Sequence, residues 1–506
     1  MNTIQQLKSG FIRQMIPLLI VISGAAFLFV ECTTPRQKSI PTILVKTNDT
    51  VTAGYIGNGA QWDPFPQAYS SWNLPISEAD WNKLYQRLDF MKPSFIRCMI
   101  SGDHRYNNKG KYDSEFHLEP LSHILSYCNR NNITVMFGDW GGGLVDSKKN
   151  TINKNELALA ARYLDFLVNE KGFSCIKYFN LVNEPNGYWS STDGKYPLWK
   201  NAVEYFYREM KKYNLTDKVQ VIGPDIAIWT TKETWWIDSC KTDLKDIIGL
   251  YDIHTYPSKS TVNSGDYSNI IRAYKEQVPV GKKIVLGELG FKYITEQDSL
   301  LRKENIQRAK NKPYASVDDS NMFVYDFFYG IDMADATMQL VNNGYAGMIA
   351  WMLDDAMHSK EGPYKLKVWG FWNILGDEFF GSQEENMRPW YYSWSIISRY
   401  MQTDANVMRV DLPATEGINA IAVEKDGHYM IALLNKSHEA HQVKLQFDNG
   451  MVLKNARIYI YADKTRPVDK NGFPVPVSQN QTIDTGKAYS VSIGPEELRV
   501  ITDFPY

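Results

Sequence analysis

The chain has 506 residues, 44% hydrophobic and 22% charged, which suits a globular protein of more than one domain. The formal net charge of −2 gives neither sign an excess and argues against a nucleic-acid partner. Cys98 and Cys175 lie in apolar runs, so we expect buried thiols and no disulfide framework. No Cys/His spacing suits a zinc site, and we predict neither a bound metal nor a cofactor.

Residues 1–32 have the pattern of an export signal. Two basic residues precede an apolar run from Met15 to Val30, which is too short and wrongly flanked for a membrane-spanning helix. Cys32 follows directly. The arrangement resembles a bacterial lipoprotein signal, although Glu31 stands where that pattern has a small residue. We expect export to the periplasm or outer-membrane surface of a bacterium, with a lipid on Cys32; the alternative is an ordinary signal peptide cut nearby.

Residues 33–52 are predicted to be a polar tether followed by an edge strand, which we expect to join the C-terminal domain. Residues 53–402 alternate strand-like runs with amphipathic helical patterns, which is typical of βαβ units around a parallel sheet. The candidate strands lie at residues 54–60, 94–100, 133–138, 178–182, 219–223, 248–256, 283–290 and 347–353. Eight strands with intervening helices predict an α/β fold, a (β/α)₈ TIM barrel.

In residues 403–506 the alternation of strand-like and helical patterns gives way to strand-like runs alone. Short runs with period-two alternation are separated by turn sequences such as Asp426-Gly427 and Asn471-Gly472, which predicts a C-terminal antiparallel β-sandwich domain. The candidate strands lie at residues 418–424, 428–435, 442–447, 456–461, 490–493 and 498–502. Because few aromatic residues appear on its exposed faces, we interpret this domain as a structural buttress. A carbohydrate-binding module is the alternative.

Two of the predicted barrel strands deliver a glutamate at their carboxyl ends. Asn183 and Glu184 follow the fourth strand, and Glu288 ends the seventh. Such a pair is what a double-displacement glycosidase requires, so we predict Glu184 as acid/base and Glu288 as nucleophile, with carboxyl groups about 5–5.5 Å apart. Arg97, inside the apolar second strand, would keep Glu288 charged. Asn183 would bond to the sugar's 2-hydroxyl.

Further substrate-binding candidates follow the third and sixth strands. Asp139 and Trp140 precede three glycines, so we expect Trp140 to be exposed in the cleft, where an aromatic face suits a sugar ring. His254 either orients the substrate or the acid/base, or is a buried structural histidine. Most of the other tryptophans near strand ends are expected to be packing residues; these are Trp62, Trp72, Trp189, Trp229, Trp235, Trp236, Trp369 and Trp372.

The order of these motifs along the barrel resembles clan A of the retaining glycoside hydrolases. The motifs are Asn183-Glu184-Pro185, His254-Thr255-Tyr256, Glu288 and Trp351. The trailing β-sandwich is similar to families 30 and 39, and the barrel motifs are shared with family 5, which frequently has a His where Asp139 and Trp140 stand. The resemblance implies that Tyr256 holds the nucleophile by a hydrogen bond. It also implies that Trp351 is a platform for the sugar next to the cleaved bond.

Two other classes of protein remain alternatives at this point. The first is a glycan-binding protein on a barrel without activity, which would keep the aromatic platforms but lose a glutamate. The second is a metal-dependent barrel enzyme that uses Asp225, His254, Glu288 and Asp354. The favoured prediction is a carbohydrate-binding, exported retaining β-glycosidase. Its sugar, its linkage, internal or terminal cleavage, and its oligomeric state are left open.

Overall fold

The computed structural model describes residues 40–64, 76–355 and 365–506. The predicted export signal, Cys32 and Trp72 lie outside these ranges. Residues 40–506 form one compact unit. No helix within the described ranges is long and apolar enough to cross a membrane.

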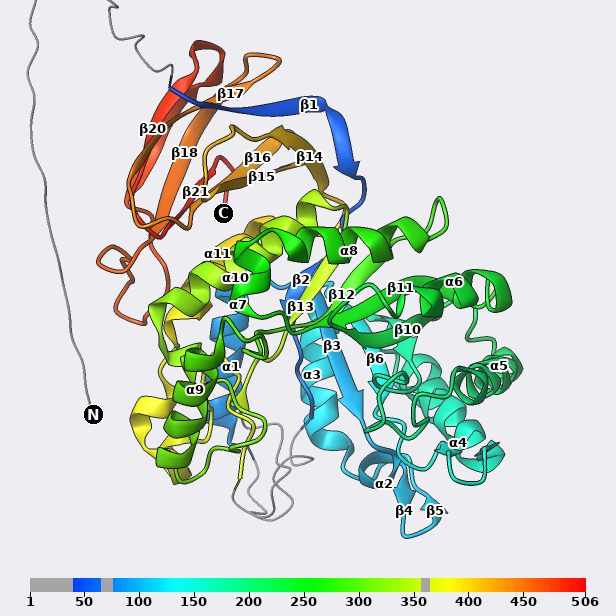
Figure 1. Cartoon of the computed structure of the whole chain (residues 1–506). Coiled ribbons are helices and arrows are strands. Elements are labelled where there is room, and N and C mark those ends of the chain that lie inside the picture. The colour runs from blue at the N-terminus through cyan, green and yellow to red at the C-terminus, as the bar shows by residue number, and fades with distance from the viewer. Residues whose placement is uncertain (1–39, 65–75, 356–364) are drawn as a thin grey trace, which may run out of the picture. The chain divides into compact units, whose positions relative to one another are not determined.

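Eight parallel strands form a barrel, in the order β2, β13, β12, β11, β10, β9, β6 and β3 (Figure 1). They are β2 (Gly57–Ala60), β3 (Phe95–Ile100), β6 (Thr134–Asp139), β9 (Ile176–Asn180), β10 (Gln220–Ile228), β11 (Ile248–Thr255), β12 (Ile284–Leu289) and β13 (Gly347–Ala350). A parallel bridge between Gln61 and Arg97 joins the two ends of this sheet, and the Trp62 amide donates to the Arg97 carbonyl at 2.8 Å. The predicted TIM barrel is therefore confirmed.

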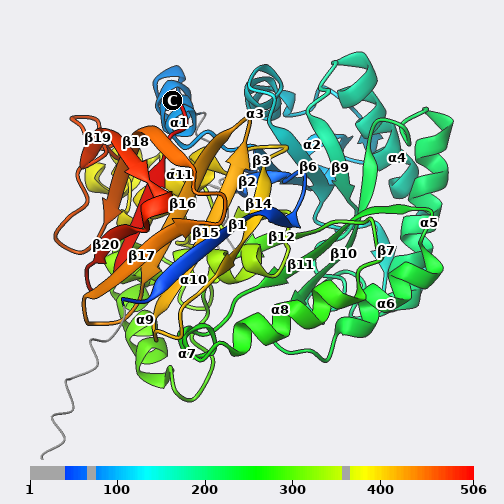
Figure 2. The same cartoon turned by 90° about the horizontal axis from the view of Figure 1, so that it is seen from above.

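Helices surround the barrel, as the view from above shows (Figure 2). The longer ones are α1 (Glu78–Met91), α3 (Leu118–Arg130), α4 (Lys154–Asp165), α5 (Tyr196–Lys212), α6 (Thr234–Asp243), α8 (Asp266–Gln277), α9 (Ser299–Asn311), α10 (Phe327–Asn342) and α11 (Pro389–Tyr400). Helix α1 begins at a capping box, in which the side chains of Ser77 and Asp80 each accept from the other's backbone amide. Its buried face includes Trp81, Leu84 and Leu88, at helical spacing.

The barrel interior is apolar near the beginnings of the strands. This buried layer consists of Ile56, Phe95, Met136, Ile222, Leu250, Val285, Ala346 and Ile349. Side chains two positions apart on a strand share a face. Arg97 therefore follows Phe95 on the inner face of β3, and Asp252 and His254 follow Leu250 on that of β11; all three are buried. Charged groups thus lie above an apolar layer, toward the carboxyl ends of the strands.

A β-bulge in β10 adds a further carboxylate to this interior. Pro224 and Ile226 pair with the consecutive residues Asp252 and Ile253 of β11, which leaves Asp225 as the extra residue. Asp225 has a φ of 58°, in the left-handed region that Asp tolerates better than most residues. Because a bulge re-aims the side chain at the extra position, the Asp225 carboxylate points inward. The sequence predicted that this strand ends at residue 223, whereas β10 continues to Ile228.

A second bulge, in β12, aims Glu288 into the interior. The consecutive β11 residues Ile253 and His254 pair with Leu286 and Glu288, so Gly287 is the extra residue. Glycine is required here because a Cβ atom on Gly287 would lie 2.4 Å from a carboxylate oxygen on the neighbouring strand. Without this bulge, strict alternation would direct Glu288 outward with Leu286, which belongs to the core outside the barrel.

The C-terminal residues form a nine-stranded sheet that folds over its own apolar core. Its strands are β1 (Thr42–Thr52), β14 (Asn406–Asp411), β15 (Ile418–Lys425), β16 (His428–Asn435), β17 (His441–Phe447), β18 (Val452–Tyr461), β19 (Ser478–Asp484), β20 (Tyr489–Ile493) and β21 (Glu497–Thr502). The Asn342 side chain donates to the Ala420 carbonyl at 3.0 Å, and the Tyr461 hydroxyl donates to the Phe327 carbonyl at 2.7 Å. The sheet therefore packs against α10, on the outside of the barrel.

Strand β1 differs from the predicted edge strand. It belongs to the C-terminal sheet, but it pairs on both sides, antiparallel to β14 and parallel to β17. The prediction of an edge is therefore wrong. The pairing register shifts between Lys46 and Thr50, and this irregularity accommodates the polar residues between them. All the other neighbouring strands of this sheet are antiparallel.

The four cysteines within the described ranges are buried free thiols, as predicted for Cys98 and Cys175.

Candidate active site

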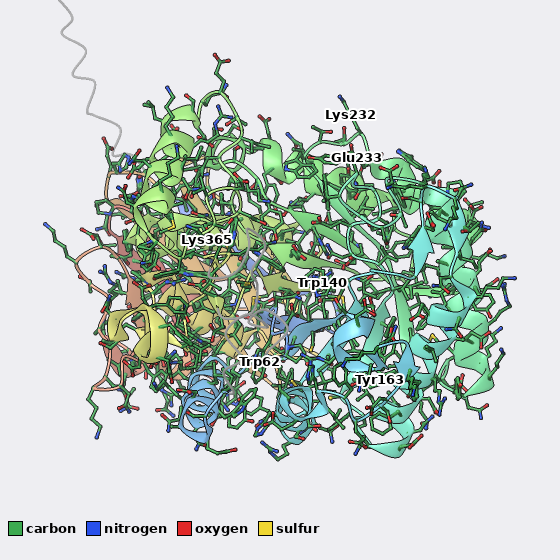
Figure 3. The ribbon with its side chains drawn as sticks, turned by 90° about the horizontal axis from the view of Figure 1, so that it is seen from below. Trp62, Trp140, Tyr163, Lys232, Glu233 and Lys365 are labelled. Atoms are coloured by element: carbon green, nitrogen blue, oxygen red, sulfur yellow. The ribbon has the colours of Figure 1, made fainter. Side chains whose placement is uncertain are left out.

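The side chains predicted for catalysis converge at the carboxyl ends of the barrel strands. Arg97 comes from β3, Glu184 from the loop after β9, His254 from β11 and Glu288 from β12. Figure 3 shows the molecule from the side on which these strands end, with Trp140 near the middle of the view. The nearest carboxylate oxygens of Glu184 and Glu288, together with a ring nitrogen of His254, all lie within 4.8 Å of one another.

Glu288 is held by two hydrogen-bond donors. Arg97 Nη1 donates to its Oε1 at 2.6 Å, and the Tyr256 hydroxyl donates to its Oε2. The side chain is 4% exposed, so the ion pair with Arg97 is shielded from water. The hydrogen bond from Tyr256 is the one that the clan A resemblance implied. The carboxylate is therefore fixed in orientation, with a cation on one side.

Glu184 is held from the opposite side of the site. It lies in the loop after β9, and its φ of 46° is in the left-handed region that few non-glycine residues adopt. Trp189 Nε1 donates to Oε2 at 2.6 Å, and His254 Nδ1 lies 3.1 Å from Oε1. The side chain is 12% exposed. Its carboxylate therefore lies between a loop indole and a buried imidazole.

The protonation of Glu184 is linked to that of His254. Burial acts to raise the pKa of Glu184, but the hydrogen bond and the charge of His254 lower it overall. Burial acts to lower the pKa of His254, but Asp225 and Glu288 raise it well above its usual value. The Glu184–His254 pair therefore carries one proton between Oε1 and Nδ1, and the surrounding carboxylates retain it.

Asp225 is a central residue that sequence reasoning considered only as a metal ligand. Its carboxylate accepts from Asn180 Nδ2 at 2.6 Å, from Arg97 Nη2 at 3.3 Å and from the Glu184 amide at 3.4 Å, and it lies 2.9 Å from His254 Nε2. Burial raises its pKa, but the charges of His254 and Arg97 hold that pKa well below the usual range. Asp225 therefore orients the arginine and histidine that contact the two glutamates.

Asp252 lies beneath this group and is also buried. One of its carboxylate oxygens is 3.8 Å from His254 Nε2. Burial, followed by the charge of Asp225, raises its pKa well above the usual value. A protonated Asp252 beside an ionised Asp225 limits the negative charge that the barrel interior has to hold.

The predicted substrate-binding residues occupy different depths. Asn183 Oδ1 accepts from Arg97 Nη2 at 2.7 Å, which places its amide beside the glutamates. Trp140 is half-buried, and its ring lies perpendicular to that of Trp351, with centroids 6.3 Å apart. Trp351 is only 3% exposed. Asp139 is buried, and it accepts from the Gly141 amide at 2.8 Å, so it supports the turn after Trp140.

Asp139 leads to a prediction about stability and pH. Burial raises its pKa to about 7, although hydrogen bonds from Gly141 and Tyr106 oppose the shift. Between about pH 4 and pH 7 the folded chain keeps this proton and the unfolded chain does not, so the free energy of unfolding falls as pH rises. Between pH 4 and pH 8 the free energy of unfolding of the wild-type protein should fall by up to about 4 kcal/mol more than that of Asp139→Asn. Urea unfolding of both proteins measures this difference, and parallel pH curves would contradict it.

The metal-dependent alternative does not fit this arrangement. Asp225, His254 and Glu288 do converge, but Asp354 lies in neither of the groups of metal-type side chains found within the described ranges. Asp354 instead accepts from the indole of Trp372 at 3.0 Å. The Arg97 guanidinium, which contacts both Asp225 and Glu288, already places a positive charge where a cation would bind.

The remaining tryptophans divide into two groups. Trp62, Trp236, Trp369 and Trp372 are buried packing residues, as predicted. Trp189, Trp229 and Trp235 are 46%, 37% and 48% exposed. The hydrogen bond from Trp189 to Glu184 was not predicted, because the four intervening residues form a loop whose path has no periodic pattern.

Solved structures share this fold across about nine tenths of the chain. A GH30 endoxylanase from Clostridium papyrosolvens matches 91% of this chain and 99% of its own, at 14% identity and a TM-score of 0.60. A GH39 β-xylosidase from Caulobacter crescentus has the same coverage, at 12% identity and a TM-score of 0.55. An endo-β-1,6-glucanase matches 92% of this chain and 94% of its own, at 14% identity and a TM-score of 0.57.

These similarities confirm a fold like that of families 30 and 39, as the sequence resemblance implied. No protein-family model matches the sequence, and no curated protein shows significant similarity to it.

Proposed function

We propose that the protein is a retaining β-glycosidase of the clan A type that hydrolyses a carbohydrate by double displacement. The observation that carries the proposal is the approach of the Glu184 and Glu288 oxygens to within 4.8 Å. Oxygens this near to each other support the closely spaced carboxyl pair of retaining enzymes, whose carboxyl groups lie roughly 5–5.5 Å apart. The shared fold with GH30 and GH39 enzymes supports the same class.

In the first step, Glu288 attacks the anomeric carbon and forms a glycosyl ester. Its orientation by Arg97 and Tyr256 supports attack along one direction. The glycosidic oxygen leaves with a proton from Glu184, and the proton shared with His254 supplies that acid. Asn183, fixed by Arg97, would bond to the sugar's 2-hydroxyl, where hydrogen bonds strengthen in the transition state.

In the second step, Glu184 is ionised and removes a proton from water as the water attacks the same carbon. The ester to Glu288 breaks, and the sugar leaves with its original configuration. Glu184 and His254 again share one proton, so the site returns to its starting state.

Export and lipid attachment belong to the same proposal. The pattern of residues 1–32 supports export to the periplasm or outer-membrane surface, with a lipid on Cys32. An enzyme in that location would meet polysaccharides and their oligosaccharides before they enter the cell.

Hydrolysis of a substrate panel tests the proposal. The panel holds 4-nitrophenyl β-glucoside and β-xyloside, β-linked glucans and xylan, and proton NMR follows the first anomer released. We expect cleavage of at least one substrate, with the β-anomer appearing first. If the α-anomer appears first, the enzyme is inverting and the mechanism is wrong. If nothing is cleaved, the proposed activity is wrong, and binding of the same panel then tests the glycan-binding alternative.

A further inference from the structure

Exposed aromatic side chains gather on the Glu184 side of the site. Six aromatic residues are exposed within the described ranges, and four of them lie between β9 and α5 or between β10 and the first turn of α6: Tyr188, Trp189, Trp229 and Trp235. The Trp189 ring lies 5.0 Å from that of Tyr188 and 6.0 Å from that of Trp229, nearly perpendicular to both. Because Trp189 also donates to Glu184, this aromatic surface begins at the proposed acid/base.

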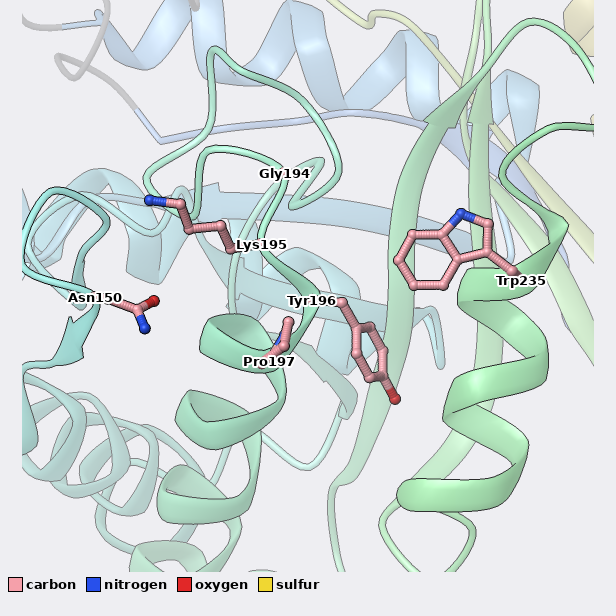
Figure 4. A pocket seen from close by; sticks show the side chains of 6 residues that line it. All are labelled: Asn150, Gly194, Lys195, Tyr196, Pro197 and Trp235. Carbon is pink, nitrogen blue, oxygen red and sulfur yellow. The ribbon is translucent and has the colours of Figure 1, made fainter.

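A hollow of about 730 Å³ lies at Trp235, where α5 and α6 begin (Figure 4). Its lining residues are Asn150, Gly194, Lys195, Tyr196, Pro197 and Trp235. The rings of Tyr196 and Trp235 have centroids 5.8 Å apart at an angle of 65°, and Trp235 keeps 48% of its surface exposed. Lys195 Nζ donates to the Ser147 carbonyl at 2.6 Å, which ties one wall of the hollow to the hairpin before α4.

We propose that this surface binds the leaving-group side of a β-linked polysaccharide, with one sugar ring stacked on Trp235 in the hollow. The inference rests on the proposed function. Glu184 protonates the leaving oxygen, so a chain that extends past Glu184 belongs to the leaving group. The surface therefore favours a substrate whose leaving group is a sugar chain over one whose leaving group is short.

The composition of the hollow suits a sugar. An exposed aromatic face accepts the apolar face of a pyranose ring, and a few polar groups around it can bond to hydroxyls. Asn150 and the backbone around Gly194 supply such groups here. The walls come from the first turns of two barrel helices, which hold the Trp235 ring in place without a substrate.

Trp235→Ala tests this inference in the full chain. The substrates are a 4-nitrophenyl β-glycoside, which ends just beyond the cleaved bond, and the polysaccharide of the same sugar. We expect kcat/KM on the polysaccharide to fall roughly tenfold, which corresponds to loss of one aromatic stacking contact, and kcat/KM on the aryl glycoside to stay unchanged. Trp235→Phe should restore most of the loss. Tyr506→Ala, which removes a partly exposed ring that follows β21 and stacks on Tyr400, is the matched control.

Two results would overturn the inference. Equal losses on both substrates would mean that Trp235 supports the fold of the site. No loss on either would mean that the hollow binds another partner, such as a protein or a second copy of the chain. Wild-type protein that cleaves neither substrate would instead refute the proposed function on which the inference rests.

Discussion

Glu288→Gln is expected to lower kcat roughly 10⁴-fold or more on every substrate that the wild-type protein cleaves. The amide oxygen of the introduced glutamine can still accept from Arg97, and its NH2 group can donate to the Tyr256 hydroxyl oxygen, so the site should keep its packing. This glutamine cannot form the glycosyl ester, because an amide is a much weaker nucleophile than a carboxylate. Steady-state rates with an aryl glycoside measure the loss.

The control for this variant is Glu209→Gln. Glu209 is also buried, but it lies on α5 and pairs with Lys212 at 2.6 Å, away from the site. Its removal should leave kcat unchanged. Thermal unfolding of both variants shows whether any loss reflects a damaged fold. A folded Glu288→Gln protein that retains a tenth of the wild-type rate would contradict the assignment of the nucleophile.

Glu184→Gln is expected to have an effect that depends on the leaving group. With a polysaccharide, whose leaving alkoxide needs a proton, kcat/KM should fall about 10²–10⁴-fold. With a 4-nitrophenyl glycoside the first step needs little acid, so the glycosyl enzyme still forms and the second step becomes limiting. Azide needs no general base, so it should restore turnover of the aryl substrate and give a β-glycosyl azide. The alkaline limb of the kcat/KM profile, set by the proton that Glu184 and His254 share, should also change.

Glu288→Gln is the comparison for the azide experiment. This variant cannot form the ester intermediate, so azide should not produce the β-glycosyl azide. Glu184 is not the acid/base if Glu184→Gln lowers kcat/KM equally on the polysaccharide and on the aryl glycoside and if azide has no effect. The distinction is independent of the absolute rates, so it holds for whichever sugar the enzyme prefers.

The strands and the two glutamates could be predicted because their signals are local. Apolar runs that end in polar residues identify strand ends, and Arg97 within such a run has nowhere to point except a buried site. The central role of Asp225 could not be predicted. It depends on a bulge at residue 225, and the surrounding run contains a proline that suggested the end of a strand.

In the C-terminal sheet, too, some features could not be predicted from local sequence patterns. Strands β14 and β19 were missed because their alternation is weak: β19 is largely exposed, and only one side chain of its seven residues is buried. The interior position of β1 was missed because it depends on pairing with residues more than 350 positions away in the chain. Periodicity indicates that a strand exists, but it does not predict which other strands pair with it.

The position of β1 also bears on the order in which the protein can fold during synthesis. Residues 42–52 leave the ribosome early, whereas their partners β14 and β17 come after the whole barrel. The C-terminal sheet therefore cannot close until the last part of the chain has been made, and until then the first strand has unpaired backbone groups. A chain that begins after Thr52 would leave β14 and β17 each with an open edge inside the sheet. The two ends of the described chain thus depend on each other for assembly, with the proposed catalytic barrel between them.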